Sequence, residues 1–316
     1  MTAQTAASDP LAAASESIAR IVARTGAAVL AVRAARRHGG ASGVVWRRGV
    51  LVTAAHALAR GARSVELVLP DGSAAQAALA GVDDSTDLAV ARLPDALAAA
   101  VEPVEVGDAA GLRAGAFVVA VGRAADGGLE ASAGIVARVG PAWRTWIGGR
   151  IDRLVRLDGA LPDGLSGAPL ADASGQAVGV GSAALARGRS VVLPASTVSR
   201  VVEELLSRGR VARAYFGITA QPARLPAAGA GPDGAAPATG LLVTSLAPDG
   251  PAEQAGLMVG DIVYEAAGAR VADLGELRDA LGPDRVGERV RLGVLRGGAR
   301  IEASIVVGER PARACG

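Results

Sequence analysis

The sequence predicts a mainly β protein, with an antiparallel barrel or sandwich over about its first two thirds and a second, compact domain after it. Short runs of Val, Leu, Ile and Ala recur at close intervals, and Gly and Pro interrupt them with little helix between. The length of 316 residues suits roughly two domains, each with enough chain to bury a core. Because the chain has only three Trp, two Tyr and two Phe, these cores must consist of aliphatic side chains.

The N-terminal part is expected to start with a disordered tail and to continue as one domain over residues 15–209. Residues 1–14 are rich in Ala and Ser, whereas apolar residues at helical spacing predict a short helix from Ser15. A glycine-rich turn is predicted at residues 38–43, with His38 as a solvated loop residue. Strands are predicted at residues 27–32, 44–46, 49–53, 64–69, 75–79, 87–92, 117–121, 129–139, 154–157, 177–182 and 190–193.

A helix and then a change of composition lead into the second domain. Apolar residues recur at helical spacing over 198–209, and Ser196 is in place to cap this helix. The second domain spans 210–308, and within it residues 221–239, which are almost wholly Pro, Ala and Gly, predict a flexible insert. A C-terminal tail is expected at 309–316. Strands are predicted at residues 240–246, 261–266, 288–296 and 299–307, and helices at residues 252–255 and 274–281.

Composition and charge argue against several classes of function. All 33 basic residues are arginines, the net charge is +2, and no basic cluster or aromatic platform indicates a nucleic acid or an anionic membrane as partner. The single cysteine, Cys315, cannot pair within the chain, so neither a disulfide nor a zinc site is expected, and no metal or cofactor is predicted. No signal peptide is visible and no apolar run is long enough to span a bilayer, which favours the cytoplasm for the sequence as written.

A serine between two glycines stands out in the segment DGLSGAPL, residues 163–170. Glycine and proline around Ser166 favour a tight turn in which backbone N–H groups surround an exposed hydroxyl, an arrangement that suits attack on a carbonyl carbon. The same residues are also the ordinary composition of loops. The segment alone therefore does not decide between a turn and an active site.

A base and a carboxylate elsewhere in the chain favour the active site. His56 directly follows an apolar strand, in VTAAH, and histidine is the side chain whose pKa suits proton transfer near neutral pH. Asp87 opens the strand DLAVAR and is the candidate for orienting the imidazole, whereas Asp83 and Asp84 are interpreted as solvated loop acids or a turn. A structural role for a lone histidine at a strand end is the alternative. The order His56, Asp87, Ser166 is one that a known catalytic triad uses.

Three segments resemble, in the same order, the motifs of chymotrypsin-like serine proteases in their bacterial HtrA-like branch. VLVTAAH is similar to the histidine motif, STDLAVARL to the aspartate strand, and DGLSGAPLADASGQAVGV to the nucleophile loop and the following hairpin, within a match over about residues 20–200. The resemblance implies a chymotrypsin-like double β-barrel with Ser166 as nucleophile, His56 as general base and acid, and Asp87 as orienting carboxylate. It also implies an oxyanion hole made by the N–H groups of Gly164 and Ser166.

Two residues depart from the usual loop of that family, which reads GNSGGPL or GDSGGPL. Leu165 replaces a polar residue but contributes only backbone to the mechanism, so this exchange is expected to be tolerated. Ala168 replaces a glycine, which would shift the loop if that position required a positive φ. An active enzyme is the prediction, and a catalytically degenerate, peptide-binding or chaperone-like protein is the alternative.

The specificity pocket is expected to lie between the residues before the nucleophile and the strand 179–183. Counting back from the serine places the floor near Ala160, where no acid would attract Lys or Arg. The family resemblance also implies cleavage after small or medium aliphatic residues. Asp158 and Asp163 lie close enough in sequence to weaken this expectation.

The segment from about residue 215 to 308 resembles a PDZ domain, on the motifs GLLV, SLAPDGPAEQAGL and VGDIV. The resemblance implies that a peptide adds to a sheet edge as a strand and that backbone N–H groups receive its C-terminal carboxylate. The residues that match this carboxylate-binding loop are Tyr215, Phe216, Gly217 and Ile218. Leu277 and Leu281, on the helix 274–281, either face the apolar pocket for the peptide or pack in the core.

A protease domain followed by a PDZ domain is the HtrA-like architecture. The resemblance implies an ATP-independent serine endopeptidase of protein quality control that cleaves unfolded or damaged polypeptides. It also implies a homotrimer, and the periplasm as the alternative compartment.

Overall fold

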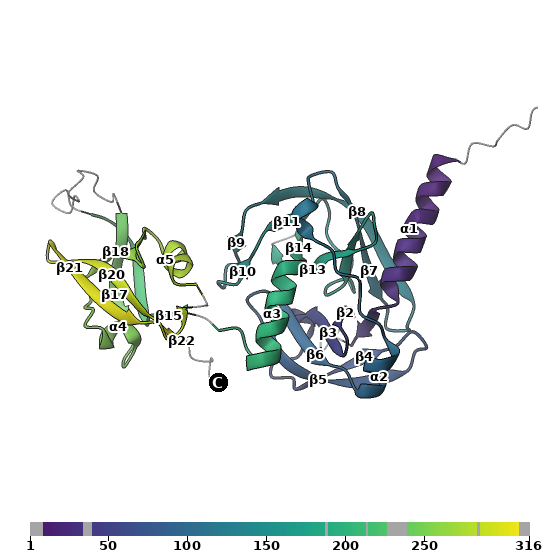
Figure 1. Cartoon of the computed structure of the whole chain (residues 1–316), viewed down its shortest axis with the longest axis horizontal. Helices are drawn as coiled ribbons and strands as arrows, with labels where there is room; N and C mark the ends of the chain where they lie inside the picture. The colour runs from purple at the N-terminus through teal and green to yellow at the C-terminus, as the bar shows by residue number, and fades with distance from the viewer. Residues whose placement is uncertain are drawn as a thin grey trace, which may run out of the picture. The chain divides into compact units, whose positions relative to one another are not determined.

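The computed structural model (Figure 1) describes residues 9–33, 40–186, 189–212, 214–225, 239–282 and 285–309. The chain divides into two compact units, Met1–Val211 and Ala212–Gly316. Strands predominate over helices in both units, so the predicted mainly β class is confirmed.

Six antiparallel strands close the first barrel of the N-terminal unit in the order β1-β2-β3-β6-β5-β4. They are β1 (Val29–Val32), β2 (Ala41–Arg47), β3 (Val50–Ala54), β4 (Ser64–Val68), β5 (Ala74–Asp83) and β6 (Leu88–Arg92). Leu30, Leu51 and Leu67 are fully buried in its core, so aliphatic side chains fill this barrel as predicted.

Six further strands close a second barrel in the order β11-β14-β13-β12-β7-β8, which confirms the double barrel. They are β7 (Phe117–Arg123), β8 (Leu129–Gly140), β11 (Leu154–Leu157), β12 (Pro169–Asp172), β13 (Ala177–Ala186) and β14 (Arg189–Pro194). A short hairpin of β9 (Trp143–Arg144) and β10 (Arg150–Ile151) joins β8 to β11. The helix α2 (Asp95–Ala100) and the 3-10 turn η2 (Ala109–Gly111) lie in the connection between the barrels.

The helix α3 (Ala195–Arg208) packs against β5 and β6 of the first barrel and against β13 and β14 of the second (Figure 1). Its apolar face, with Val198, Val201 and Leu205, is completely or almost completely buried. It ends at Gly209, whose φ of 69° is the left-handed conformation that glycine adopts readily. The predicted cap by Ser196 is wrong, because the helix begins at Ala195 and no side chain caps it.

The first helix, α1 (Pro10–Gly26), begins earlier than the sequence indicated. Residues 10–14 were expected to be disordered, but Asp9 accepts a hydrogen bond from the N–H of Leu11 across 3.0 Å and Pro10 occupies the first turn. An aspartate cap, a proline at the first position and a run of alanines all favour a helix. Residues 1–8 lie outside the described part of the chain.

A buried arginine holds the end of α1 against the barrels. Arg123, on β7, donates from its guanidinium to the carbonyl oxygens of Gly26, Val29 and Gly127 across 2.7, 2.6 and 2.5 Å. Burial lowers the pKa of Arg123 from its usual value, and the three carbonyls stabilise its positive charge.

The predicted glycine-rich turn at 38–43 is wrong in its second half. The strand β2 begins at Ala41 and therefore contains Ser42 and Gly43. A Cβ on Gly43 would lie 2.9 Å from the side chain of Leu51, so this glycine allows close packing inside the barrel rather than a turn. His38 lies outside the described residues.

The C-terminal unit is built on one antiparallel sheet in the order β16-β17-β18-β20-β21, with β19 paired to β18. Its strands are β15 (Ala214–Tyr215), β16 (Ile218–Arg224), β17 (Thr239–Leu246), β18 (Ile262–Ala266), β19 (Ala269–Arg270), β20 (Arg289–Arg296), β21 (Ala299–Val306) and β22 (Gly308–Glu309). Two helices, α4 (Pro251–Gln254) and α5 (Leu274–Leu281), accompany the sheet. Leu241, Val263 and Ile305 are fully buried in the core of this unit.

Two predicted boundaries in the C-terminal unit are wrong. Residues 221–224 belong to β16, and Thr239 begins β17, so the predicted insert at 221–239 is shorter at both ends. Pro222 is tolerated in β16 because this strand lies at the sheet edge, where a missing N–H costs no ladder hydrogen bond. Residues 226–238 lie outside the described part. Glu309, predicted to start the tail, pairs with Ala214 instead.

An ion pair fastens the β18 end of the sheet. The carboxylate of Asp261 is almost completely buried and accepts hydrogen bonds from the guanidinium of Arg296 and from the N–H of Met258, all across 2.8 Å. Burial alone would raise the pKa of Asp261, but the hydrogen bonds and the positive charge of Arg296 outweigh burial, so this pKa lies below its usual value.

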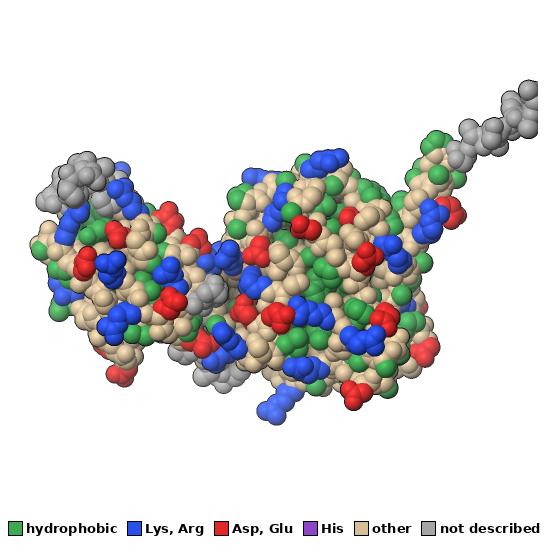
Figure 2. All heavy atoms as spheres, viewed as in Figure 1, with side chains coloured by type: hydrophobic (Ala, Val, Ile, Leu, Met, Phe, Trp, Pro, Cys, Tyr) green, Lys and Arg blue, Asp and Glu red, His purple; other side chains and the backbone are tan. Residues whose placement is uncertain are grey.

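Charged side chains of both signs are interspersed on the face of the N-terminal unit in Figure 2. Among the described residues, no helix is both long and apolar enough to cross a membrane. The described part of the chain also contains no group of three or more His, Cys, Asp or Glu residues placed to hold a metal ion.

Candidate active site

His56 lies in the turn that follows β3 and faces Asp87, which lies directly before β6. It is the middle residue of the 3-10 turn η1 (Ala55–Ala57). Its Nδ1 is 2.8 Å from Oδ2 and 2.9 Å from Oδ1 of Asp87, and its backbone N–H donates to the same Oδ1 across 2.9 Å. Because β3 and β6 are neighbours in the barrel, two residues 31 positions apart meet at adjacent strand ends.

The Asp87 side chain is only 4% exposed, whereas that of His56 is 40% exposed. Asp87 adopts a positive φ of 57°, which is rare for a residue with a side chain and is best tolerated by Asp and Asn. Ser182, on β13 of the second barrel, donates its hydroxyl to Asp87 Oδ2 across 2.6 Å. The carboxylate is therefore held from both barrels. Ser182 was predicted only as part of a pocket wall, and its contact with Asp87 has no sequence signal.

The turn before Asp87 is also built around a buried acid. Asp83 was interpreted as a solvated loop acid or a turn, but it is 2% exposed, so the solvated reading is wrong. Its carboxylate accepts hydrogen bonds from the hydroxyls of Ser85 and Thr86 across 2.7 Å each. The carbonyl of Ser85 accepts in turn from the hydroxyl of Thr145 in the β9–β10 hairpin, across 2.8 Å. This local network explains how the turn keeps Asp87 in an uncommon conformation.

Ser166 lies in the loop before β12, against the first barrel. Its carbonyl oxygen accepts from the N–H of Ser42 on β2 across 3.0 Å. The next residue, Gly167, has a φ of 84°, and a Cβ there would lie 2.2 Å from the carbonyl oxygen of Ser42 and 2.8 Å from the N atom of Ala54. Only glycine fits this approach, which brings the loop beside the strand that leads into His56.

The backbone around Ser166 leaves two N–H groups for a ligand. Neither the N–H of Gly164 nor that of Ser166 donates to an acceptor in the described part of the chain. Gly164 has a φ of 89°, a conformation that favours glycine. Both N–H groups belong to the residues that were predicted to form an oxyanion hole.

The two departures from the family loop have a structural explanation. The positive φ values of this loop occur at Gly164 and Gly167, and Ala168 has none. The exchange of glycine for Ala168 therefore introduces no backbone strain. Leu165 is 1% exposed and fills the space above Gly122, where a Cβ would lie 2.2 Å from its Cδ2 atom. Leu165 therefore contributes a buried anchor as well as backbone.

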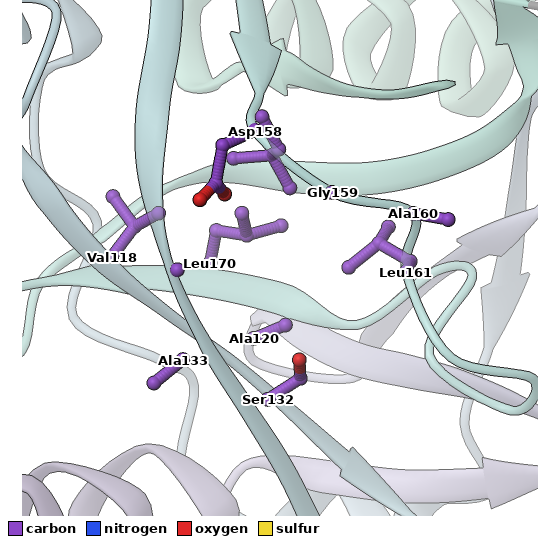
Figure 3. A pocket seen from close by; sticks show the side chains of 11 residues that line it. Val118, Ala120, Ser132, Ala133, Asp158, Gly159, Ala160, Leu161 and Leu170 are labelled. Atoms are coloured by element: carbon purple, nitrogen blue, oxygen red, sulfur yellow. The ribbon is translucent and has the colours of Figure 1, made fainter. Parts of the chain in front are cut away.

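The predicted pocket floor, Ala160, lines a pocket of about 80 Å³ between β7, β8 and the segment after β11 (Figure 3). Figure 3 shows Asp158, Leu161 and Leu170 around the same space, with the Asp158 carboxylate directed into it. The strand 179–183, predicted as the other wall, does not contribute to the lining of this pocket. The side chains of Leu161 and Leu170 approach that strand at Gly181, where a Cβ would lie 2.6 and 3.0 Å from them.

In the C-terminal unit, the predicted carboxylate-binding loop joins β15 to β16. The carbonyls of Phe216 and Gly217 accept from the N–H groups of Ala252 and Ala247 across 2.8 and 2.7 Å. The N–H groups of Phe216 and Gly217 themselves donate to no acceptor among the described residues. Tyr215 ends β15 and Ile218 begins β16, the strand at the sheet edge. The loop thus presents N–H groups beside an open strand edge.

Leu277 and Leu281, on α5, are each 3% exposed and lie in the core of the C-terminal unit. Their side chains could either face the apolar pocket for a peptide or pack in the core. Because nearly all of their surface is buried in the core, the structure favours core packing. Leu274 and Ala280 of the same helix are only half-buried.

Two family models match the chain. The model of the trypsin-like peptidase domain matches residues 41–180, and the model of the PDZ domain matches residues 214–307.

Curated relatives cover most of this chain. The chain is 31% identical over 272 residues to a putative serine protease HhoB of Synechocystis, a match of 83% of this chain and 64% of the relative. It is 32% identical over 268 residues to a probable periplasmic serine endoprotease DegP-like of Bartonella henselae, covering 83% of this chain and 52% of that protein. It is 30% identical over 290 residues to the serine protease Do-like HtrA of Bacillus subtilis, covering 86% and 64%. The chain thus spans between about half and two thirds of the length of these relatives.

Solved structures show the same two-unit fold. A serine endoprotease from Yersinia pestis superposes with a TM-score of 0.73 at 26% identity, covering 93% of this chain and 98% of that one. An HtrA-type protease bound to a decapeptide superposes with a TM-score of 0.75, covering 94% and 98%, at 24% identity.

Proposed function

The chain belongs to the HtrA-like serine proteases that carry a PDZ domain, and on this premise we propose that it is an ATP-independent serine endopeptidase that cleaves unfolded or damaged polypeptides. One observation carries the proposal. The buried carboxylate of Asp87 accepts hydrogen bonds from both Nδ1 and the backbone N–H of His56. The loop of Ser166 lies beside this pair, because Gly167 fits closely against the strand before His56.

In the proposed mechanism, the Ser166 hydroxyl attacks the carbonyl carbon of the scissile bond while Nε2 of His56 takes its proton. Asp87 fixes the tautomer that carries a proton on Nδ1 and stabilises the imidazolium cation that forms. The same imidazolium then protonates the leaving amine, and water, activated by His56, hydrolyses the acyl-enzyme.

The oxyanion of each tetrahedral intermediate is bound by the N–H groups of Gly164 and Ser166. Removal of one such donor typically lowers kcat by about 100- to 1000-fold. Because the loop places its positive φ values at glycines and none at Ala168, its conformation is compatible with these donors and supports an active enzyme over the degenerate alternative.

We propose that the PDZ domain binds the C-termini of peptides. The carboxylate would be received by the N–H groups of the loop formed by Tyr215, Phe216, Gly217 and Ile218, while the peptide pairs with the edge of β16. The structure of an HtrA-type protease with a decapeptide supports peptide recognition in this fold.

Three further features are proposed from the family alone. Cleavage after small or medium aliphatic residues is proposed from the resemblance. The carboxylate of Asp158 beside Ala160 opposes this preference, because it would attract Lys or Arg side chains. A homotrimer is the proposed assembly. Of the two compartments, the name of the Bartonella relative supports the periplasm, and none of the relatives' names supports the cytoplasm.

The activity is tested with casein or a labelled peptide and a fluorophosphonate probe on the full chain and on Ser166→Ala. The wild type is expected to cleave and to be labelled, and Ser166→Ala to lose labelling and at least about a thousandfold of kcat. A wild type that binds peptide but neither cleaves nor labels across temperature and pH would support the non-catalytic alternative. Cleavage that survives Ser166→Ala would show that the nucleophile is assigned wrongly.

A further inference from the structure

Ser42 lies where the first barrel contacts the loop of Ser166 on the second. It is the second residue of β2 and is completely buried. Its backbone N–H donates to the carbonyl oxygen of Ser166 across 3.0 Å, and its hydroxyl donates to the carbonyl oxygen of Gly164 across 2.8 Å. A single residue therefore binds the carbonyl oxygens of both residues whose N–H groups form the proposed oxyanion hole.

The direction of the Ser42 hydroxyl is itself fixed. Its oxygen accepts from the backbone N–H of Arg123 across 3.1 Å, so its one proton is left for the carbonyl of Gly164. The position of Arg123 is restrained in turn, because its buried guanidinium binds the carbonyls of Gly26 at the end of α1, Val29 at the start of β1 and Gly127 in the β7–β8 turn. The carbonyl oxygen of Ser42 accepts from the hydroxyl of Thr53 across 2.8 Å.

These contacts constrain the two donors of the oxyanion hole. Each peptide group is planar, so a hydrogen bond to its carbonyl restricts the orientation of the whole peptide. The peptide that carries the N–H of Ser166 lies between two peptides whose carbonyls Ser42 holds. Gly164 has no Cβ to restrict rotation about its backbone bonds. The hydrogen bond from Ser42 restrains its carbonyl group instead.

No water can replace the hydroxyl if it is removed. A Cβ on Gly122 would lie 2.6 Å from the Ser42 hydroxyl and 2.2 Å from the side chain of Leu165, so the space between β2, β7 and the loop is already filled. Loss of one oxygen atom leaves a void smaller than a water molecule needs. Without the hydroxyl, the carbonyl of Gly164 loses this donor, and its peptide keeps the hydrogen bond from the N–H of Leu165 to the carbonyl oxygen of Pro162 across 3.1 Å.

We propose that Ser42 is a positioning residue of the peptidase reaction, whose hydroxyl holds the Gly164 carbonyl so that the N–H groups of Gly164 and Ser166 keep their direction toward the oxyanion. The inference rests on the proposed endopeptidase function. Ser42 touches neither substrate nor the reacting atoms, so its effect is confined to the geometry of the donors.

The test compares Ser42→Ala, Ser42→Cys and the wild type in the full chain, with a labelled peptide and with the rate of fluorophosphonate labelling. Ser42→Ala is expected to lower kcat and the labelling rate about 10- to 100-fold, less than deletion of a donor, with KM changed less than about threefold. Ser42→Cys, which keeps a weak S–H donor but places a larger atom in this filled space, is expected to lie between the wild type and Ser42→Ala. Hydrogen exchange of residues 160–170 is expected to accelerate in Ser42→Ala.

Thr197→Val is the matched control. Thr197 is completely buried in the same unit, and its hydroxyl bonds to Asp152, away from the loop. It is expected to lower thermal stability as Ser42→Ala does while leaving kcat and exchange of the loop unchanged. If Ser42→Ala does not fold, Ser42→Cys carries the same comparison.

The outcomes separate the inference from the function on which it rests. A wild type that cleaves and labels, with a folded Ser42 variant whose kcat stays within about twofold, would overturn the role of Ser42 alone. A loss of kcat/KM that comes from a change in KM alone would overturn this role as well. So would a loss of kcat in Thr197→Val equal to that in Ser42→Ala. A wild type that neither cleaves nor labels would overturn the proposed function.

Discussion

Ser182 donates its hydroxyl to the carboxylate of Asp87 across 2.6 Å, from β13 of one barrel to a strand end of the other. Asp87 thereby keeps two kinds of donor, the N–H groups of His56 on one side and the hydroxyl of Ser182 on the other. A buried carboxylate needs such partners, because each one offsets part of the free energy lost when the charge leaves water.

Ser182→Ala is expected to lower kcat by about tenfold at unchanged KM and to destabilise the N-terminal unit by about 2 kcal/mol, because the buried Asp87 loses a charge-assisted hydrogen bond. Steady-state kinetics with a labelled peptide and thermal unfolding measure the two effects. Ser199→Ala is the control, since it removes a hydroxyl that bonds to Trp46 away from the site. Equal kcat values for Ser182→Ala and Ser199→Ala would contradict the role given to Ser182.

Gly167→Ala is expected to abolish measurable cleavage and to lower the melting temperature strongly. A Cβ at this position would meet the backbone of Ser42 and Ala54 and would also impose a side chain on a φ of 84°. Gly61→Ala separates the two causes, because Gly61 has a φ of 74° but open space around it, so only backbone strain of about 1–2 kcal/mol is expected there. Activity in Gly167→Ala comparable to that of Gly61→Ala would show that the close approach is not required.

The stability of the C-terminal unit is expected to decrease in acid through Asp261. The pKa of Asp261 is depressed in the folded state, so the ion pair with Arg296 contributes its full stability above the unfolded pKa of about 4 and loses it as the pH falls through the lower folded pKa. Asp261→Asn is expected to destabilise this unit by about 2 kcal/mol at pH 7 and to flatten the acid dependence.

Hydrogen exchange of residues 239–309 in the full chain, measured between pH 7 and the acid range and corrected for the intrinsic rate, reports on this unit alone. Asp249→Asn is the control, because Asp249 is exposed and Asn accepts its positive φ. An acid dependence of Asp261→Asn equal to that of the wild type would contradict the assignment.

Regular elements with clear periodicity could be predicted from the sequence. The helix α5 has the predicted bounds of 274–281, and β11 those of 154–157. The hairpin of β9 and β10 has strands of two residues each, too short for any alternation. The strand β12 begins with Pro169, a residue typical of loops, directly after the glycines of the Ser166 loop. Short strands of this kind form because the barrel around them supplies the partners.

Only those residues of the candidate site that belong to a sequence motif could be predicted. His56, Asp87 and Ser166 stand in motifs, and the structure brings His56 and Asp87 into direct contact. The residues that orient them, Ser42 and Ser182, are ordinary strand serines whose contacts span 122 and 95 residues. Nothing local to a serine in a strand shows which distant carbonyl or carboxylate it meets.

The helix α3 is the last element of the N-terminal unit in chain order, and it contacts both barrels. The six strands of the first barrel, with His56 and Asp87 at strand ends, all precede Ser166 in the chain and are synthesised before the proposed nucleophile. Ser166 follows only with the second barrel, and α3, which contacts both barrels, emerges last in this unit. A chain that ends before Ser166 therefore carries His56 and Asp87 without the proposed nucleophile, and one that ends before Ser182 lacks the hydroxyl that binds Asp87.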